Sequence, residues 1–192
     1  MNTNVEELAH SFNVVLDKRI SAKIKDVQET VASKIKERRN YDNSPHLAVA
    51  TKFMRAVITD NFVKALYKEF SAEKPFEITF TRFESAETGN YIFLNLDTES
   101  REKLFALSER AFQVTRGVGF EGHGGLAPKY PYDPHISVIK LETEEINHAL
   151  GLINKDLSNL KMRASAFEIT RGQLNDKGFG EFPVVATINL QE

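Results

Sequence analysis

Two short segments of the chain begin alike, with Pro-His followed by a run of small and apolar residues. The histidine is His46 in the first segment and His135 in the second. Each segment is typical of the start of a β-strand, where side chains two positions apart lie on the same face. His46 and Ala48 are therefore expected to point the same way, as are His135 and Ser137. Two histidines in equivalent places suggest one shared site for acid–base chemistry.

The residues that follow the two segments also repeat. The tetrapeptide Phe-Glu-Ile-Thr begins at Phe76 and again at Phe167, about equally far beyond His46 and His135, and an apolar segment follows each copy. This order predicts an internal duplication of about 50 residues per copy. Each unit is expected to contain a strand, a helix and two further strands.

Hydrophobic periodicity and turn residues predict the following elements. The first unit has a strand at 46–53, a helix at 59–70 and strands at 76–83 and 91–96. A connecting helix from 98 to 117 and a glycine-rich loop at 116–134 come next. The second unit has a strand at 135–141, a helix at 143–157 and strands at 162–171 and 184–190.

Residues 4–39 are expected to form one long helix. Apolar residues recur every three or four positions from Val5 to Ile35, and neither glycine nor proline interrupts them. A helix of about 35 residues is long for a globular protein, which leaves two arrangements open. The helix packs across the body of the protein, or it protrudes and joins copies of the chain in a homo-oligomer or grips another partner.

Composition limits the function further. A formal net charge of −2 argues against a general nucleic-acid coat, but it leaves room for a pocket that takes a short nucleotide. The absence of cysteine excludes disulfides, thiolate nucleophiles and thiolate metal sites, and no other metal-ligand motif is present. No apolar run approaches the ~20 residues of a membrane span. We therefore expect a cytoplasmic protein with no metal, no cofactor and no membrane partner.

The two motifs, in this order of elements, resemble the 2H phosphoesterase superfamily. That superfamily includes 2′,5′ RNA ligase-like proteins and cyclic nucleotide phosphodiesterases, and its pattern is a pair of His-x-Thr/Ser-x motifs. His46-Leu47-Ala48-Val49 and His135-Ile136-Ser137-Val138 occupy those places here. The resemblance implies an α+β fold with two lobes, whose antiparallel sheets face a central cleft. The likeness covers residues 44–190.

Domain organisation follows from this resemblance and from the repeat. Residues 1–40 are expected to form an N-terminal helical extension, and residues 41–192 a bilobal domain. Within that domain, lobe one is expected at about 44–97, the connecting helix and loop at 98–134, and lobe two at 135–192.

By resemblance, His46 and His135 act as general acid and general base, in an order that the sequence leaves open. Ser137 is then expected to hydrogen-bond a phosphoryl oxygen and to stabilise the charge of the transition state. The resemblance implies no metal and no cofactor. It also implies substrates of one kind: 2′,3′-cyclic phosphates, or phosphodiesters with a neighbouring 2′-hydroxyl.

The first motif departs from the family pattern, because Ala48 stands where the family usually has Thr or Ser. Loss of a hydroxyl aimed at the phosphate costs about 1–3 kcal/mol. Thr51 has the wrong strand parity to replace it unless a bulge intervenes. Lys52 has the right parity but lies far along the strand, and Arg82 on a neighbouring strand is a third candidate.

Other residues are candidates for substrate contact. Tyr132 leads into the second motif. It is expected either to stack on a nucleotide base or to pack where the glycine-rich loop joins the strand. His123 lies in the glycine-rich loop, either exposed or against the substrate. Arg82 is a candidate phosphate contact. His10 and His148 are expected on helix surfaces.

Three functions follow from these observations. The first is a metal-independent phosphodiesterase that acts on RNA ends or on cyclic or 2′-5′ oligonucleotides. The second is a non-catalytic protein of the same fold that binds or sequesters nucleotides or short RNA, which Ala48 motivates. The third is an interaction protein that works through its N-terminal helix.

Overall fold

The computed structural model describes residues 7–35, 45–85, 91–118, 133–153, 160–172, 174–175, 178–179 and 182–192. The strands within these ranges are β1 (Glu7–Val14), β2 (Leu47–Arg55), β3 (Phe76–Ser85), β4 (Tyr91–Leu96), β5 (Ile136–Lys140), β6 (Leu160–Ala164), β7 (Ala166–Gly172), β8 (Leu174–Asn175), β9 (Gly178–Phe179) and β10 (Val184–Asn189). The helices are α1 (Lys18–Lys34), α2 (Thr59–Phe70), α3 (Thr98–Val114) and α4 (Thr143–Leu152), with a short 3-10 turn η1 (Ala56–Ile58).

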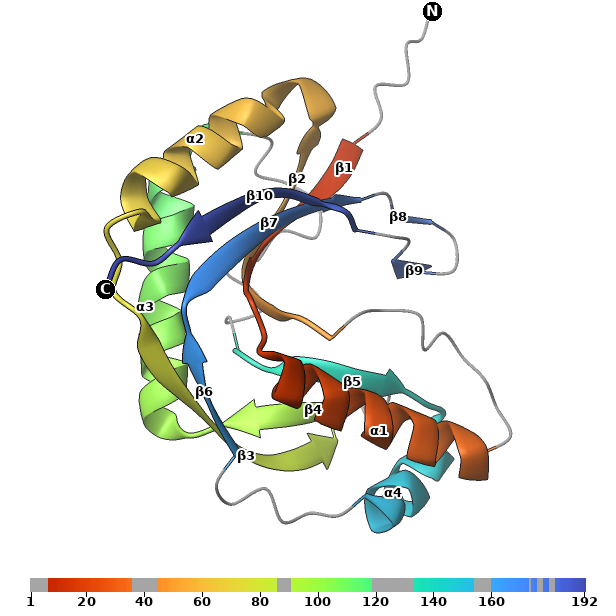
Figure 1. Ribbon diagram of the computed structural model, residues 1–192. Coiled ribbons are helices and arrows are strands. Elements are labelled where there is room, and N and C mark those ends of the chain that lie inside the picture. Colours follow the sequence, from red (N-terminus) through yellow and green to blue (C-terminus); the bar gives the residue numbers. More distant parts are fainter. Residues whose placement is uncertain are drawn as a thin grey trace, which may run out of the picture.

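One curved antiparallel sheet organises the fold (Figure 1). Its eight strands have the order β10-β7-β1-β2-β5-β4-β3-β6, while β8 and β9 form a separate hairpin. Only Ser165 separates β6 from β7 along the chain, yet β6 lies at one edge of the sheet and β7 next to the other edge. A single residue cannot span a flat sheet of this width, so the sheet has to curl until its ends approach each other.

The sheet divides into two halves at the junction of β2 and β5. The strands β10, β7, β1 and β2 form one half, and β5, β4, β3 and β6 form the other. Leu47 and Ile136 are the single residue pair that joins β2 to β5, whereas the other neighbouring strands pair over longer stretches. The two halves therefore meet at one narrow junction.

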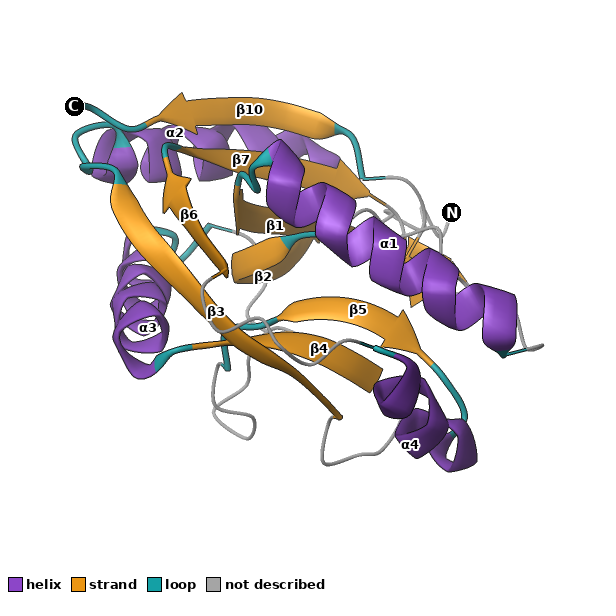
Figure 2. Cartoon of the chain, turned by 60° about the horizontal axis from the view of Figure 1, so that its bottom comes forward, coloured by secondary structure: helices purple, strands orange, loops and turns teal. Residues whose placement is uncertain are grey.

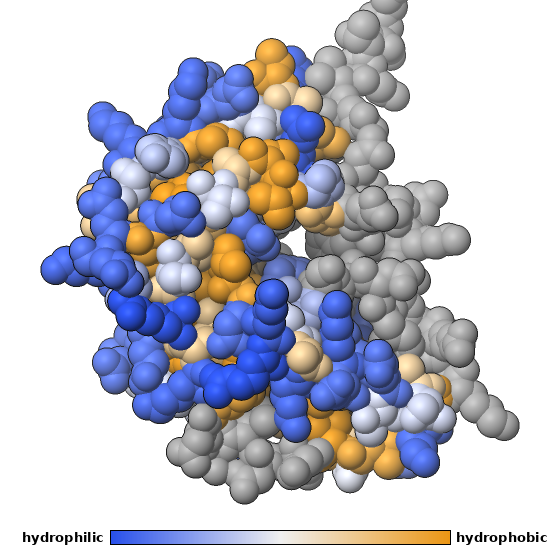
Figure 3. Space-filling view, viewed as in Figure 1, coloured by the Kyte–Doolittle hydropathy of each residue, from blue (hydrophilic) through white to orange (hydrophobic). Residues whose placement is uncertain are grey.

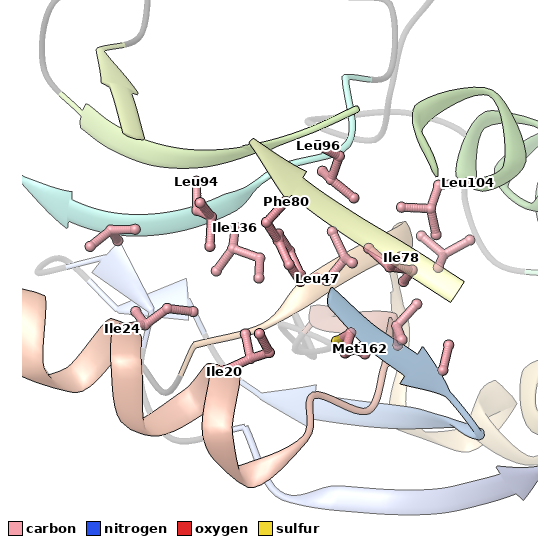
Figure 4. Packing of buried hydrophobic residues seen from close by; sticks show 14 of the residues in the cluster. Ile20, Ile24, Leu47, Ile78, Phe80, Leu94, Leu96, Leu104, Ile136 and Met162 are labelled. Atoms are coloured by element: carbon pink, nitrogen blue, oxygen red, sulfur yellow. The ribbon is translucent and has the colours of Figure 1, made fainter. Parts of the chain in front are cut away.

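One face of the sheet is apolar and is covered by helices; we call it the helix face. Phe12 of β1 lies 5.0 Å from Phe70 of α2 and 4.7 Å from Phe167 of β7, measured between ring centroids. At the junction, Ile20 and Ile24 of α1 point toward Leu47 and Ile136 (Figure 4). Burial of these apolar side chains is the main source of stability.

Helices cover both halves of the sheet, and α3 packs against strands of each half (Figure 2). Helices α1 and α4 pack together, α1 against β5 and α4 against β3 and β4, while α2 packs against β10 and α3 against β2 and β3. The exposed side of α1 is mostly hydrophilic, whereas apolar residues gather over β10, where Val184 and Val185 are exposed (Figure 3). Among the described residues, no helix is both long and apolar enough to cross a membrane.

The predicted long N-terminal helix is wrong. Residues 7–14 form the strand β1, which lies between β2 and β7, and the helix α1 begins only at Lys18. Asp17 caps this helix, because its side chain accepts a hydrogen bond from the backbone N–H of Ile20. Both faces of β1 are buried, so its sequence lacks the alternation of apolar and polar residues that marks a half-buried strand. Its apolar residues also continue the helical spacing of α1, which explains the wrong prediction.

His10 was also placed wrongly, because it lies in β1 and is fully buried rather than on a helix surface. Its Nε2 is 2.8 Å from the hydroxyl oxygen of Thr59 in α2, and its Nδ1 donates to the carbonyl oxygen of Leu8 at 3.0 Å. Burial lowers the pKa of His10. His148 lies on the exposed side of α4, as predicted.

The predicted helix at 59–70 and the strand at 91–96 are confirmed as α2 and β4. The single strand expected at 162–171 is instead two strands, β6 and β7, which belong to different halves of the sheet. Likewise, the expected lobe one contributes β2 to one half but β3 and β4 to the other. The domain boundaries drawn from the sequence stay a prediction.

The duplicated units are not seen in the form expected. On one side of the central pair, Leu47 is paired with Val14, and Val14 with Phe167. On the other side, Ile136 is paired with Leu94, and Leu94 with Phe83. The counterpart of Phe167 is thus Phe83, whereas Phe76 lies farther along β3, opposite Ala164 of β6. The two Phe-Glu-Ile-Thr copies do not occupy equivalent positions.

We predict that Phe12→Ala lowers the free energy of unfolding by about 3–5 kcal/mol, because it leaves a cavity between β1, α2 and β7. Urea denaturation followed by circular dichroism measures the loss. Phe105→Ala is the matched control, since Phe105 on α3 is 43% exposed. Equal losses for both variants would contradict a central position for β1.

Candidate active site

The pair Leu47 and Ile136 determines the geometry of the candidate site. Both side chains are fully buried on the helix face. The residues on either side of each therefore lie on the opposite face, which we call the site face. These residues are His46 and Ala48 on β2, and His135 and Ser137 on β5. Their side chains are exposed or half-buried, in contrast to the central pair.

The antiparallel register brings the two motifs together. One residue to either side of the central pair, His46 comes opposite Ser137, and Ala48 comes opposite His135. His46 and His135 are then diagonal neighbours, about 7–8 Å apart on the backbone for regular pairing. The structure thus places the predicted residues His46, His135 and Ser137 on one face, at one junction.

Contacts around His135 fix the orientation of its ring. Its Nδ1 donates a hydrogen bond to the backbone carbonyl oxygen of Asp133 at 2.7 Å. The ring also packs on Phe93 of β4, with centroids 5.1 Å apart and an angle of 42° between the planes. Arg101 of α3 forms an ion pair with the Asp133 carboxylate and so anchors this turn. In the neutral ring Nδ1 carries the proton, so Nε2 is the atom that can accept one.

A carboxylate lies near His46, on the other half of the sheet. Asn13 of β1 pairs with Ala48 on one side and with Glu168 of β7 on the other, so these three residues form a row across the site face. Burial raises the pKa of Glu168, while the nearby His46 acts in the opposite direction. Glu168 therefore lies within electrostatic reach of His46.

A β-bulge changes the strand parity of Thr51. Phe12 pairs with Ala50 and Asn13 with Ala48, so β2 carries one extra residue at this point. As a result Thr51, which pairs with Ser11, lies on the site face together with Ala48. The bulge that the sequence analysis required before Thr51 could face the site is present.

Four polar side chains next to Ala48 form a hydrogen-bonded chain. The hydroxyl of Ser11 donates to Oδ1 of Asn13 at 2.6 Å, and Nδ2 of Asn13 donates to the hydroxyl oxygen of Thr170 at 3.2 Å. Thr51 and Ser11 are 3.2 Å apart. Since the single hydroxyl hydrogen of Ser11 is used on Asn13, Thr51 is the donor to Ser11. The amide of Asn13 retains a second N–H beside Ala48.

The other two candidates to replace the missing hydroxyl are placed differently. Lys52 lies on the helix face, where its Nζ donates to the carbonyl oxygen of Thr115 at 2.7 Å and lies over the ring of Phe112. Arg82 is exposed on β3 and forms an ion pair with Glu84, which also accepts a hydrogen bond from Asn95. Lys52 is thus directed away from Ala48, whereas Arg82 lies on β3, two strands away from β5 in the sheet.

Tyr132 and His123 lie outside the described residues, so their proposed substrate contacts stay predictions. Sequence reasoning missed Asn13, Phe93, Asn95 and Glu168. Glu168 belongs to the second Phe-Glu-Ile-Thr copy, which the sequence analysis took only as a sign of duplication. No motif marks the other three, because each lies within an ordinary strand and comes onto this face only through sheet pairing. Within the described ranges, no three His, Asp or Glu side chains cluster in a way that would hold a metal ion.

Two comparisons with known proteins found matches, one to a family and one to solved structures. The family model of the 2′-5′ RNA ligase superfamily matches residues 16–176. No curated protein sequence matches the chain. Among solved structures, the fold is similar to that of Escherichia coli LigT complexed with 3′-AMP, with a TM-score of 0.71, 15% identity, and coverage of 97% of this chain and 100% of that chain.

Two further structures have a similar fold. The Thermus thermophilus protein TT0787 has a TM-score of 0.67 and 14% identity, over 94% of this chain and 97% of that chain. Kluyveromyces marxianus Usb1 has a TM-score of 0.56 and 11% identity, over 97% and 99% of the two chains.

The chain therefore belongs to the 2′-5′ RNA ligase superfamily, the 2H phosphoesterases, as the sequence predicted. Membership supports a phosphodiesterase type of function. The likeness to LigT covers 97% of the chain and thus includes β1 and α1, which the sequence analysis had placed outside the shared fold.

We predict that His46→Ala raises the pKa of Glu168, because an imidazolium nearby favours the charged carboxylate. Titration of the carboxyl carbon of Glu168 by NMR measures this pKa. His148→Ala removes an exposed histidine from α4 and should leave it unchanged. If the pKa of Glu168 stays the same in His46→Ala, the two side chains do not meet across the site face.

Proposed function

We propose that this protein is a metal-independent phosphodiesterase whose catalytic residues are His46 and His135. The observation that carries the proposal is the placement of both His motifs on one face, at the single junction of β2 with β5. Cleavage of a phosphodiester needs one group that takes a proton from the nucleophile and one that gives a proton to the leaving oxygen. Two imidazoles on opposite sides of a phosphate meet this need.

The surroundings of the two histidines favour a division of roles. His135 donates from Nδ1 to a carbonyl oxygen, so Nε2 is ready to accept a proton and His135 is the general base for hydrolysis of a cyclic phosphate. Glu168 lies within electrostatic reach of His46 on the other half of the sheet, and we assign His46 as the general acid. The nucleophile loses its proton to His135, the bond from phosphorus to the leaving oxygen breaks, and His46 protonates that oxygen.

We propose that Ser137 and Asn13 hold the phosphoryl oxygens. Ser137 is exposed on β5 opposite His46 and offers a hydroxyl hydrogen. In the first motif Ala48 offers none, but the remaining N–H of Asn13 lies directly opposite it. Ser11 and Thr170 fix the Asn13 amide, so its N–H is oriented in advance. Asn13 thereby replaces the hydroxyl that the family pattern has at position 48.

The substrate that we propose is a small nucleotide with a 2′,3′-cyclic phosphate, or a short 2′-5′-linked or cyclic oligonucleotide. LigT, which has a similar fold, is solved with 3′-AMP, with ATP and with NADP+. Arg82 and Lys140 are exposed on the second half of the sheet and provide positive charge. Tyr132 and His123 remain candidates for base and phosphate contacts.

The second candidate function is a nucleotide-binding protein of the same fold without catalysis. Ala48 motivates it, since a hydroxyl is missing from the first motif. Both functions require nucleotide binding, but only the phosphodiesterase turns over its substrate. An assay therefore has to measure binding and turnover.

We predict that the protein cleaves a member of a panel of 2′,3′-cyclic nucleotides, 2′-5′ oligoadenylate and cyclic di- and trinucleotides in the presence of EDTA. His46→Ala and His135→Ala should each lower kcat by about 10²–10⁴-fold, because each removes a general acid or base. His148→Ala is the matched control. Product analysis by chromatography and ligand binding by calorimetry are run on all four proteins.

Turnover that needs a metal ion, or that survives both substitutions, would contradict the two-histidine mechanism. Binding of one panel member without turnover would instead establish the non-catalytic function.

We predict that Asn13→Ala lowers kcat/KM at least about tenfold, since it removes one hydrogen bond to a charged oxygen. Ala48→Thr in the same background should recover part of this loss by restoring a hydroxyl. Asn147→Ala, on the exposed side of α4, is the control, and thermal unfolding confirms that each variant is folded during the assay. A loss that Ala48→Thr does not recover would assign Asn13 a structural role only.

A further inference from the structure

The half of the sheet that contains β2 and the half that contains β5 have the same strand register next to the site. Each half carries a β-bulge, at Val49 in β2 and at Val138 in β5, and each bulge is the third residue after a motif histidine. The first bulge brings Thr51 onto the site face, and the second brings Lys140 onto it. Each position near the site on one half therefore has a counterpart on the other half.

The side chains at these counterpart positions differ in kind. Ser11 pairs with Thr51 on the half with β2, whereas Tyr91 pairs with Lys140 on the half with β5. Ser11 is 7% exposed and its hydroxyl is used on Asn13, while Tyr91 is 38% exposed. One half of the site face thus carries small polar groups that already bond to one another, and the other half carries an exposed aromatic ring.

Tyr91 lies on the site face close to the second motif. Tyr91 and Phe93 are two positions apart on β4, so their side chains lie on the same face, about 7 Å apart along the strand. The ring of Phe93 in turn contacts the ring of His135, with centroids 5.1 Å apart. A nucleoside is long enough to extend from a phosphate beside His135 to the ring of Tyr91.

A cation holds the ring of Tyr91 in place. Nζ of Lys140 lies over this ring, 5.3 Å from its centroid. The contact restricts the orientation of the ring and still leaves more than a third of the residue exposed. Sites for single-stranded nucleic acid combine these two features, an aromatic ring on which a base stacks and a positive charge close to the phosphate backbone.

We propose that Tyr91 is the residue on which the nucleobase of the substrate stacks. This inference rests on the proposed function and deepens it, because it assigns the base to one half of the site face. The base lies over β4 and β5, and the phosphate lies between His46 and His135. Stacking uses the flat face that every base has, so the site accepts nucleotides without a strict choice of base.

The test compares 2′,3′-cyclic AMP with methyl ribofuranoside 2′,3′-cyclic phosphate, which has no base. Tyr91→Ser installs the residue that occupies the counterpart position on the other half. It should raise KM for the nucleotide by about 5- to 150-fold and leave KM for the base-free substrate unchanged. It should leave kcat for both substrates close to the wild-type value, because the base is remote from the bonds that form and break.

Two further variants serve as controls. Tyr91→Phe keeps the ring and should retain the KM of the wild-type protein for the nucleotide. Tyr67→Ser removes a tyrosine that is 55% exposed on α2 and should change neither KM. Calorimetry with 3′-AMP and with ribose 3-phosphate gives a readout that needs no turnover, and Tyr91→Ser should weaken binding of 3′-AMP alone.

Equal losses for the nucleotide and the base-free ligand in Tyr91→Ser would show a structural role and overturn the inference. An unchanged KM and an unchanged affinity for the nucleotide would overturn it as well, and would leave the proposed function intact. If the wild-type protein neither cleaves nor binds any nucleotide of the panel, the proposed function itself is contradicted and the inference fails with it.

Discussion

The contact between Leu47 and Ile136 is the constraint on which the rest of the structure depends. It is the one residue pair that joins β2 to β5, and thus the two halves of the sheet. Because both side chains are buried on the helix face, the adjacent residues of each strand face the other way. Apolar packing at the junction therefore brings His46 and His135 onto one surface, although 88 residues lie between them in the sequence.

The two faces of the sheet carry different kinds of side chain. Phe12, Phe70 and Phe167 pack together on the helix face, where they contribute apolar burial. The site face instead carries hydroxyls, amides and a carboxylate in a row across the strands. Rigid strands hold these groups in fixed positions relative to one another.

The residues around the first histidine motif come from more than one strand. Ala48 lacks a hydroxyl, but a bulge in β2 and the neighbouring strand β1 place Thr51, Ser11 and Asn13 around it. Asn13 lies 35 positions before Ala48 in the chain, so comparison of the sequence around the motif does not show that the two residues are paired. The Phe-Glu-Ile-Thr repeat suggested two equivalent units, but Phe76 and Phe167 match in sequence and not in their position in the sheet.

The sequence by itself determined the family, the two histidine motifs, and the elements whose periodicity is local, such as the helix at 59–70. These features depend on the spacing of residues close together in the chain. The tertiary structure decided that residues 7–14 form a strand, since pairing on both edges and burial of both faces override the helical spacing. It also decided which residues surround the histidines. Asn13, Asn95 and Glu168 come onto the same face as the histidines only through hydrogen-bonded strand pairing. The register between distant strands is set by packing of the whole sheet rather than by any short stretch of sequence.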